Sequence, residues 1–152
     1  MLIEAELIAR TVILSSARPD AATEVWAYQT LAARNPGYRR HLAEALIRRE
    51  RSGLDLPVRL RLSQEAVATA RLIDPVRDHH ATDVLIWALD ALQRNLFEAG
   101  REAEGWTARR EILARHHPGL HRECRVTDCY GGKLPIPVEQ WAASSPDTDP
   151  AR

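Results

Sequence analysis

Apolar side chains recur every three or four residues along most of the chain up to about residue 116, a spacing that places them on one face of an α-helix. The pattern predicts six helices, over about residues 2–16, 19–35, 38–52, 55–73, 81–99 and 101–116. The fifth is the clearest, because Leu85, Leu89, Leu92 and Leu96 share one face. The hydrophobic pattern therefore predicts an all-α protein.

Glycine and proline mark several of the predicted helix ends. Gly53 and Gly100 follow the third and fifth helices, where glycine commonly ends a helix. Pro19 is expected in the first turn of the second helix, a position that proline tolerates well.

The fourth helix has a competing interpretation. Residues 58–62 read VRLRL and alternate with period two, which is typical of a strand. Asp55 and Pro57 are a suitable cap and first-turn residue for a helix, and residues 64–68 read QEAVA. We favour the helix, with the strand as the alternative.

An internal repeat indicates how the helices are organised. Residues 30–40 read TLAARNPGYRR and residues 112–122 read ILARHHPGLHR, with Leu, Ala, Pro, Gly and the last Arg in register. Together with Asp74-Pro75, prolines follow helical stretches at positions 36, 75 and 118, which are 39 and 43 residues apart. Such a period is typical of helical-repeat arrays. The sequence thus predicts an α-solenoid of about three antiparallel helix pairs, followed by an irregular C-terminal tail.

The fifth and sixth helices carry the clearest unit: large residues on the first helix, a glycine turn, a small residue on the second helix and a closing proline. These positions are Leu89, Leu92, Leu96, Gly100, Gly105 and Pro118. The segment resembles a tetratricopeptide repeat, in the long form seen in GC-rich bacteria, and the other two units match in part. The resemblance implies a repeat domain over residues 1–120 that binds a protein or peptide without catalysis or a cofactor.

In such a repeat domain the ligand lies against the first helices of the pairs. On these helices the residues expected to contact a partner are Arg48, Arg49, Trp87, Arg94 and Asn95. For the three helical tryptophans, at positions 26, 87 and 106, core packing is the favoured interpretation, and Trp87 is the best candidate for the groove because it lies beside the leucine stripe.

Charge adds one alternative. The formal net charge is zero, so no whole-chain field favours nucleic acid. Residues 38–61 hold seven arginines against three acidic residues, which indicates either solvated surface charge or a surface for an acidic peptide or a phosphate backbone. No helix-turn-helix reader is recognisable, and aromatic residues are not interleaved with the arginines. We therefore favour surface charge over nucleic-acid binding.

One cluster has metal-ligand chemistry: His117, His121, Cys124 and Cys129. A structural zinc site needs four ligands, usually in two closely spaced pairs, and this spacing lacks the paired sets. We favour the absence of a metal site. A regulatory protein that binds nucleic acid or a metal ion, through the arginine-rich segment or this cluster, is the alternative function.

The remaining features concern location and the tail. No run of 18 apolar residues predicts a membrane span, and early acidic residues argue against a signal peptide. Because two cysteines are too few for a disulfide framework, we expect a cytoplasmic protein. Residues 121–152 are expected to be irregular, with about the last ten disordered. Either residues 134–141 of this tail cover an exposed helix face, or the protein forms a homodimer.

Overall fold

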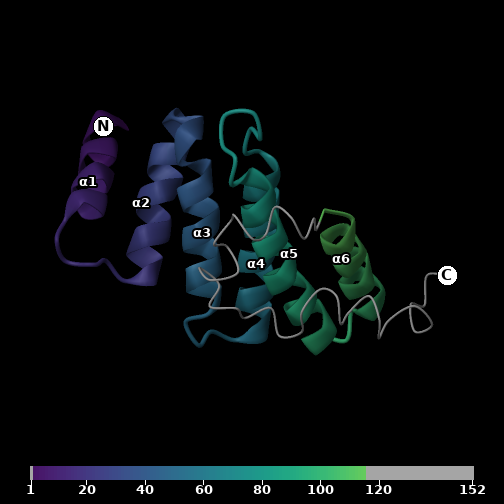
Figure 1. Cartoon of the computed structure of the whole chain (residues 1–152). Coiled ribbons are helices and arrows are strands. Elements are labelled where there is room, and N and C mark those ends of the chain that lie inside the picture. Colours follow the sequence, from purple (N-terminus) through teal and green to yellow (C-terminus); the bar gives the residue numbers. More distant parts are fainter. Residues whose placement is uncertain (1, 116–152) are drawn as a thin grey trace.

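The computed structural model describes residues 2–115, apart from the side chains of Leu2 and Leu113. All regular secondary structure in the described part is helical, without a strand. Its elements are α1 (Leu2–Leu14), α2 (Ala21–Arg34), the short 3₁₀-helix η1 (Pro36–Tyr38), α3 (Arg39–Glu50), α4 (Leu56–Arg71), α5 (Ala81–Glu98) and α6 (Glu102–Arg115). The helices follow one another side by side in chain order, and their connections alternate between the two ends of the array (Figure 1).

All six predicted helices are found, and the helical interpretation of residues 58–62 is confirmed. Leu62, Ala66 and Ala70 are buried at a spacing of four residues, so α4 has one continuous apolar face. Pro57 lies in its first turn, where the missing N–H costs nothing. The period-two alternation of VRLRL is too short to outweigh the helical pattern that follows it.

The start of α2 corrects one prediction. Pro19 precedes the helix, and Asp20 is the N-cap residue. The Asp20 carboxylate accepts hydrogen bonds from the Thr23 backbone N–H at 2.9 Å and from the Thr23 hydroxyl at 2.8 Å. Capping by a short acidic side chain satisfies a helical N–H that would otherwise lack a partner, so the helix begins after the cap.

Gly100 directly follows the C-cap of α5, as predicted, whereas α3 ends at Glu50 and Gly53 lies three residues further on, in the turn after it. Gly53 has a φ of 79° and Gly100 a φ of 72°, in the left-handed region that residues with a Cβ atom avoid. At Gly100 the chain also closes the end of α5, because the Arg101 N–H donates to the Leu96 carbonyl at 2.9 Å. This is the bond that defines a Schellman motif.

The main core extends over α2 to α6, and α1 is attached through a smaller cluster. Fully buried Leu46, Ile86 and Leu89 belong to the main core. The smaller cluster holds Ala9 against Ala27 and Leu31. Each helix packs against the next one in the chain, and α3 also contacts α5. α5 thus contacts α3, α4 and α6, and 13 of its 18 residues are buried.

Gly105 explains how closely α6 approaches α5. A Cβ atom at this position would lie 3.0 Å from the Phe97 ring. A side chain at this position would require the Phe97 ring to shift, so the glycine allows the two helices to pack closely here.

No helix in the described part is long and apolar enough to cross a membrane. The expected domain boundary near residue 120 and the tail over residues 121–152, including its last ten residues, lie outside the described residues.

Candidate functional site

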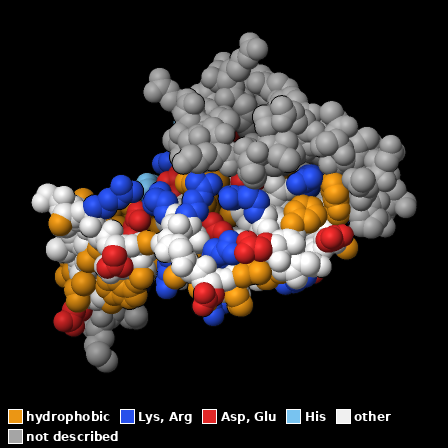
Figure 2. All heavy atoms as spheres, turned by 90° about the horizontal axis from the view of Figure 1, so that it is seen from below, with side chains coloured by type: hydrophobic (Ala, Val, Ile, Leu, Met, Phe, Trp, Pro, Cys, Tyr) orange, Lys and Arg blue, Asp and Glu red, His pale blue; other side chains and the backbone are white. Residues whose placement is uncertain are grey.

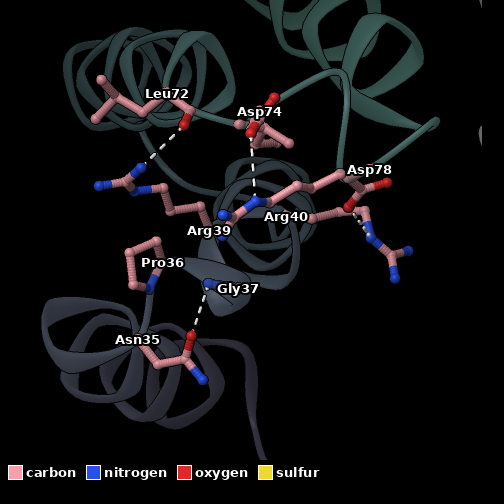
Figure 3. Close-up of a pocket in the computed structure, with 10 residues that line it drawn as sticks. Asn35, Pro36, Gly37, Arg39, Arg40, Leu72, Asp74 and Asp78 are labelled. Atoms are coloured by element: carbon pink, nitrogen blue, oxygen red, sulfur yellow. Dashed lines mark hydrogen bonds and ion pairs between the residues drawn. The ribbon is translucent and has the colours of Figure 1, made fainter.

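Two helix connections at the same end of the array enclose a cleft (Figure 3). One is the turn from α2 to α3, and the other is the loop from α4 to α5. The cavity between them has a volume of about 390 Å³. It is lined by Asn35, Pro36, Gly37, Arg39, Arg40, Leu72, Ile73, Asp74, Arg77 and Asp78. A volume in this range is typical of sites that hold a small ligand or a few residues of a peptide.

Short polar side chains brace both connections. Asn35 accepts a hydrogen bond from the Gly37 N–H at 2.9 Å. In the second connection Asp74 accepts from the Val76 N–H and Asp78 from the His80 N–H, both at 2.9 Å. Such Asx turns fix the backbone locally, so the walls of the cleft are held by the sequence of the turns themselves.

Three arginines give the cleft its charge. Arg39 donates from NH1 to the Leu72 carbonyl at 3.0 Å, which ties one wall to the other. Arg40 forms an ion pair with Asp78, with Nε 2.9 Å from Oδ2, and Arg77 lies 3.6 Å from Asp74. With three guanidinium groups against two carboxylates, the lining carries a net charge of +1.

The cleft combines cationic and apolar surface. The Arg77 side chain is 89% exposed, so its guanidinium group is accessible. Leu72 is 59% exposed on the lining, and Val76 in the same loop is 92% exposed. A guanidinium group has five N–H donors that suit a carboxylate or phosphate. The arrangement can therefore hold an anionic group beside an apolar side chain.

The five residues predicted to bind a partner lie elsewhere. Arg48 and Arg49 are on α3 and half-buried. Arg48 reaches back to α2, where its Nη2 lies 2.5 Å from Glu24 Oε1 and its Nε lies 3.3 Å from Oε2. This bidentate ion pair connects α3 to α2, so the Arg48 side chain contributes to the packing of these two helices.

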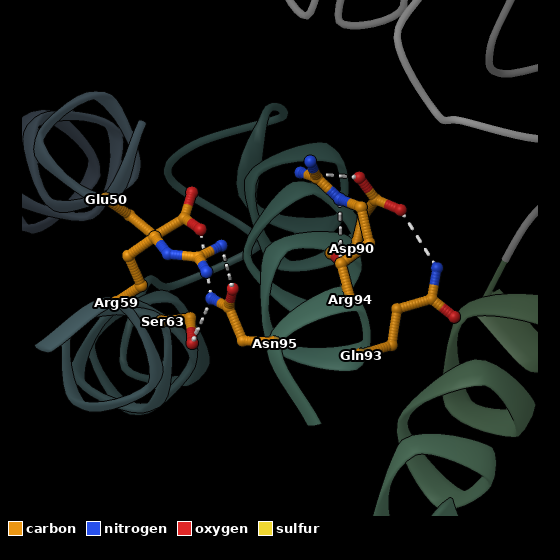
Figure 4. A network of polar contacts seen from close by, with 7 residues as sticks. All are labelled: Glu50, Arg59, Ser63, Asp90, Gln93, Arg94 and Asn95. Atoms are coloured by element: carbon orange, nitrogen blue, oxygen red, sulfur yellow. Dashed lines mark hydrogen bonds and ion pairs between the residues drawn. The ribbon is translucent and has the colours of Figure 1, made fainter. Parts of the chain in front are cut away.

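Asn95 is the hub of a buried polar network between α3, α4 and α5 (Figure 4). Its amide donates to Glu50 at 2.9 Å and to Ser63 at 3.2 Å, and its oxygen accepts from Arg59 at 3.1 Å. Asn95 is 1% exposed and Glu50 is 4% exposed. Sequence reasoning assigned Asn95 to a ligand surface, whereas the structure gives it internal partners.

Arg94 belongs to a second network on α5. Its NH2 lies 3.1 Å from the Asp90 carboxylate, which also accepts from Gln93 at 2.9 Å. Burial raises the pKa of the Asp90 carboxyl, and Arg94 and then Gln93 lower it in part. The Arg94 side chain is 35% exposed, so of the neighbours Arg94 and Asn95 it is Arg94 that reaches the surface.

The tryptophans divide between core and surface. Trp87 is 6% exposed within the main core, with the Arg51 guanidinium group 5.6 Å from its ring centroid. Trp106 packs edge-on against Phe97. Trp26 is 41% exposed on α2. Core packing is thus the observed role of Trp87, and a groove contact for it stays a prediction.

The metal-ligand candidates His117, His121, Cys124 and Cys129 lie outside the described residues. Among residues 2–115, no group of three or more His, Cys, Asp or Glu side chains could hold a metal ion.

Sequence reasoning indicated no site at Leu72 or Arg77, and it included Arg39 only as one of the seven arginines of residues 38–61. One signal was present, because both connections carry an Asx-Pro pair, Asn35-Pro36 and Asp74-Pro75. In a helical-repeat array, turns that recur at the repeat spacing lie side by side. The space between two such turns can form a cleft.

No family model, curated protein or solved structure matches the chain.

Proposed function

We propose that the six helices stack as an α-solenoid of three antiparallel pairs, and that the chain is a non-catalytic module that binds a protein or peptide. The occupant of the cleft is an acidic segment of the partner that also carries an apolar side chain. The observation that carries this proposal is the cleft itself, in which guanidinium groups and an exposed leucine line one cavity between two helix turns.

Contacts between alternate helices support the solenoid. Gln29 of α2 donates to Glu65 of α4 at 2.9 Å, and Arg71 of α4 pairs with Glu111 of α6 at 2.7 Å. The paired residues are 36 and 40 positions apart, close to the spacing of the closing prolines. The same kind of contact thus recurs one unit further along the chain, as expected where each unit packs on the next.

The chemistry of the cleft supports a peptide ligand. A carboxylate would bind to Arg77 and to the N–H groups of Arg39 that the Leu72 carbonyl does not use. A leucine or valine of the ligand would pack on Leu72 and Val76. Because the walls are braced by their own turns, little conformational entropy is lost when the ligand binds.

Selection from a library of short random peptides tests this function. We expect the selected peptides to share an acidic residue next to an aliphatic one. Arg77→Gln and Leu72→Ala should each weaken the binding of a selected peptide about tenfold, the effect of losing about 1.4 kcal/mol. Both side chains are largely exposed, so the fold should tolerate the changes. Arg18→Gln is the matched control and should not change the affinity, because Arg18 is an exposed arginine between α1 and α2 that does not line the cleft.

Two results would contradict the proposal. One is a library without enriched peptides, or with peptides that bind equally well to the Arg77→Gln variant and the wild type. The other is binding of oligonucleotides that weakens steeply with salt while peptides do not bind, which would favour the nucleic-acid alternative.

A further inference from the structure

The first helix exposes an unusual line of large apolar side chains. Ile3 is 69% exposed, Leu7 58% and Leu14 83%. At 3.6 residues per turn these three positions fall within about 40° of one another around the helix axis. Ala9, which is buried against α2, lies on the opposite side. The line therefore faces away from the rest of the array.

We call this line the α1 face: Ile3, Leu7 and Leu14. Ile8 is 50% exposed but lies about 100° around the helix axis from Leu7, outside this line. Figure 2 shows hydrophobic side chains gathered at the left end of the molecule, where α1 lies in Figure 1. Contiguous apolar surface on a soluble protein commonly marks an interaction site.

The first and last helices of the described array, α1 and α6, expose different kinds of side chain on their outer sides. The outer side of α6 presents Ala103, Thr107 and Arg110, and none of the described exposed residues of this helix is a large hydrophobic. Head-to-tail packing of two copies would place Leu7 and Leu14 against this polar surface. Packing of α1 on α1 covers both apolar surfaces at once, which is the self-complementary geometry of a two-fold interface.

We propose that the α1 face binds the α1 face of a second copy of this chain, with the two helices antiparallel. Seam positions 3, 7, 10 and 14 are spaced by four, three and four residues, as in a helix–helix seam. Antiparallel pairing about the midpoint of this seam places Ile3 opposite Leu14 of the second copy and Leu7 opposite Arg10.

Charge favours the antiparallel direction. Arg10 is the one charged residue in the seam, its side chain is 55% exposed, and it pairs with Glu6 at 2.6 Å. In an antiparallel pair its aliphatic stem covers Leu7 of the other copy, and its guanidinium group stays near the acidic first half of that helix. In a parallel pair the two Arg10 side chains would face each other, and like charges in contact are unfavourable.

The size of the α1 face predicts a weak dimer. A helix of 13 residues is about 20 Å long and about 10 Å wide, so the contact falls below the roughly 800 Å² per partner of a standard interface. We therefore expect association that depends on concentration. This inference is separate from the proposed peptide binding, because no residue of the α1 face lines the cleft.

Sedimentation velocity of the full chain, from about 1 μM to about 1 mM, tests the dimer. We expect a monomer–dimer equilibrium, and Leu7→Arg should weaken it at least about tenfold because it places arginine against Arg10 of the second copy. Leu7→Arg combined with Arg10→Glu should restore association through two new ion pairs. Ala103→Arg, which adds the same charge on α6, is the control and should leave association unchanged. Circular dichroism checks that each variant keeps the helical content of the wild type.

Three outcomes would overturn the inference. The first is a wild-type chain that stays monomeric over the whole concentration range. The second is equal association of the Leu7→Arg and Ala103→Arg variants. The third is a monomeric chain that dimerises only when residues 116–152 are deleted, which would assign the α1 face to the chain's own C-terminal segment.

Discussion

Replacement of Asn95 by alanine tests whether the buried network holds α3, α4 and α5 together. The substitution removes two donated hydrogen bonds, to Glu50 and Ser63, and one that Asn95 accepts from Arg59. Arg59 keeps its ion pair with Glu98, but Glu50 loses the amide that faces its carboxylate. Because Glu50 is 4% exposed, water cannot simply replace that donor.

The expected loss follows from these contacts. A hydrogen bond to a charged group contributes about 1.5–3 kcal/mol, and a buried acceptor left without its donor costs about 1–3 kcal/mol. Both figures describe the loss of the same hydrogen bond at Glu50, so only the first is counted. To it we add about 1 kcal/mol for the missing side-chain volume. The variant should therefore lose about 2.5–4 kcal/mol of unfolding free energy, a large part of the usual 5–15 kcal/mol.

Urea unfolding followed by circular dichroism measures this loss. With a slope near 2 kcal/mol per molar, the midpoint should fall by about 1.2–2 M. Glu50→Met removes the carboxylate to which Asn95 donates. The Asn95→Ala, Glu50→Met double variant should therefore lose about 1.5–3 kcal/mol less unfolding free energy than the sum of the two single losses. A loss below about 1 kcal/mol, or single effects that add within about 0.5 kcal/mol, would refute the reasoning.

Two further predictions concern packing and pH. Gly105→Val should destabilise the protein by at least about 2 kcal/mol, because even the added Cβ atom would lie 3.0 Å from the Phe97 ring and the branched side chain needs more room. Gly53→Ala should cost only about 1–2 kcal/mol in thermal or urea unfolding, because the space around it is open and only its φ of 79° is unfavourable for alanine. Burial, and then the charge of Arg40, lower the pKa of His41, so the unfolded chain binds the proton more readily than the folded one. The contribution of His41 to the unfolding free energy should therefore be complete above about pH 6.5 and decrease as the pH falls through the lower folded-state pKa. His41→Phe keeps the stacking on Tyr28 and should reduce this pH dependence, measured by urea unfolding at several pH values. An equal pH dependence in the wild type and the variant would contradict this assignment.

The helices could be predicted from the sequence because their signals are local. Apolar spacing identified all six, and Gly53 and Gly100 marked two of the ends by a backbone conformation that glycine alone adopts easily. The start of α2 was misplaced by a short distance, since Pro19 and Asp20 are adjacent and both are common at helix starts. Only the hydrogen bonds of the Asp20 side chain decide which of them caps the helix.

The candidate site could not be predicted in the same way, because its contacts join residues that are far apart in the chain. Within the arginine-rich stretch, the sequence reveals pairs four residues apart, such as Arg40 with Glu44. It does not reveal that Arg39 reaches the carbonyl of Leu72 or that Arg48 reaches Glu24. Several charges that the sequence left as solvated surface or an acidic-partner site therefore connect neighbouring helices.

Position 95 shows why a helical wheel alone was insufficient. On the wheel, Asn95 lies away from the leucine stripe, which on a helix with one buried face means exposure to solvent. α5 instead packs against α3, α4 and α6, so positions on both sides of the stripe are buried as well. A polar side chain in such a place is stable only with internal partners, and Asn95 has them in Glu50, Arg59 and Ser63. A polar residue on a helix that is apolar in most directions is therefore better interpreted as a connection between helices than as a ligand contact.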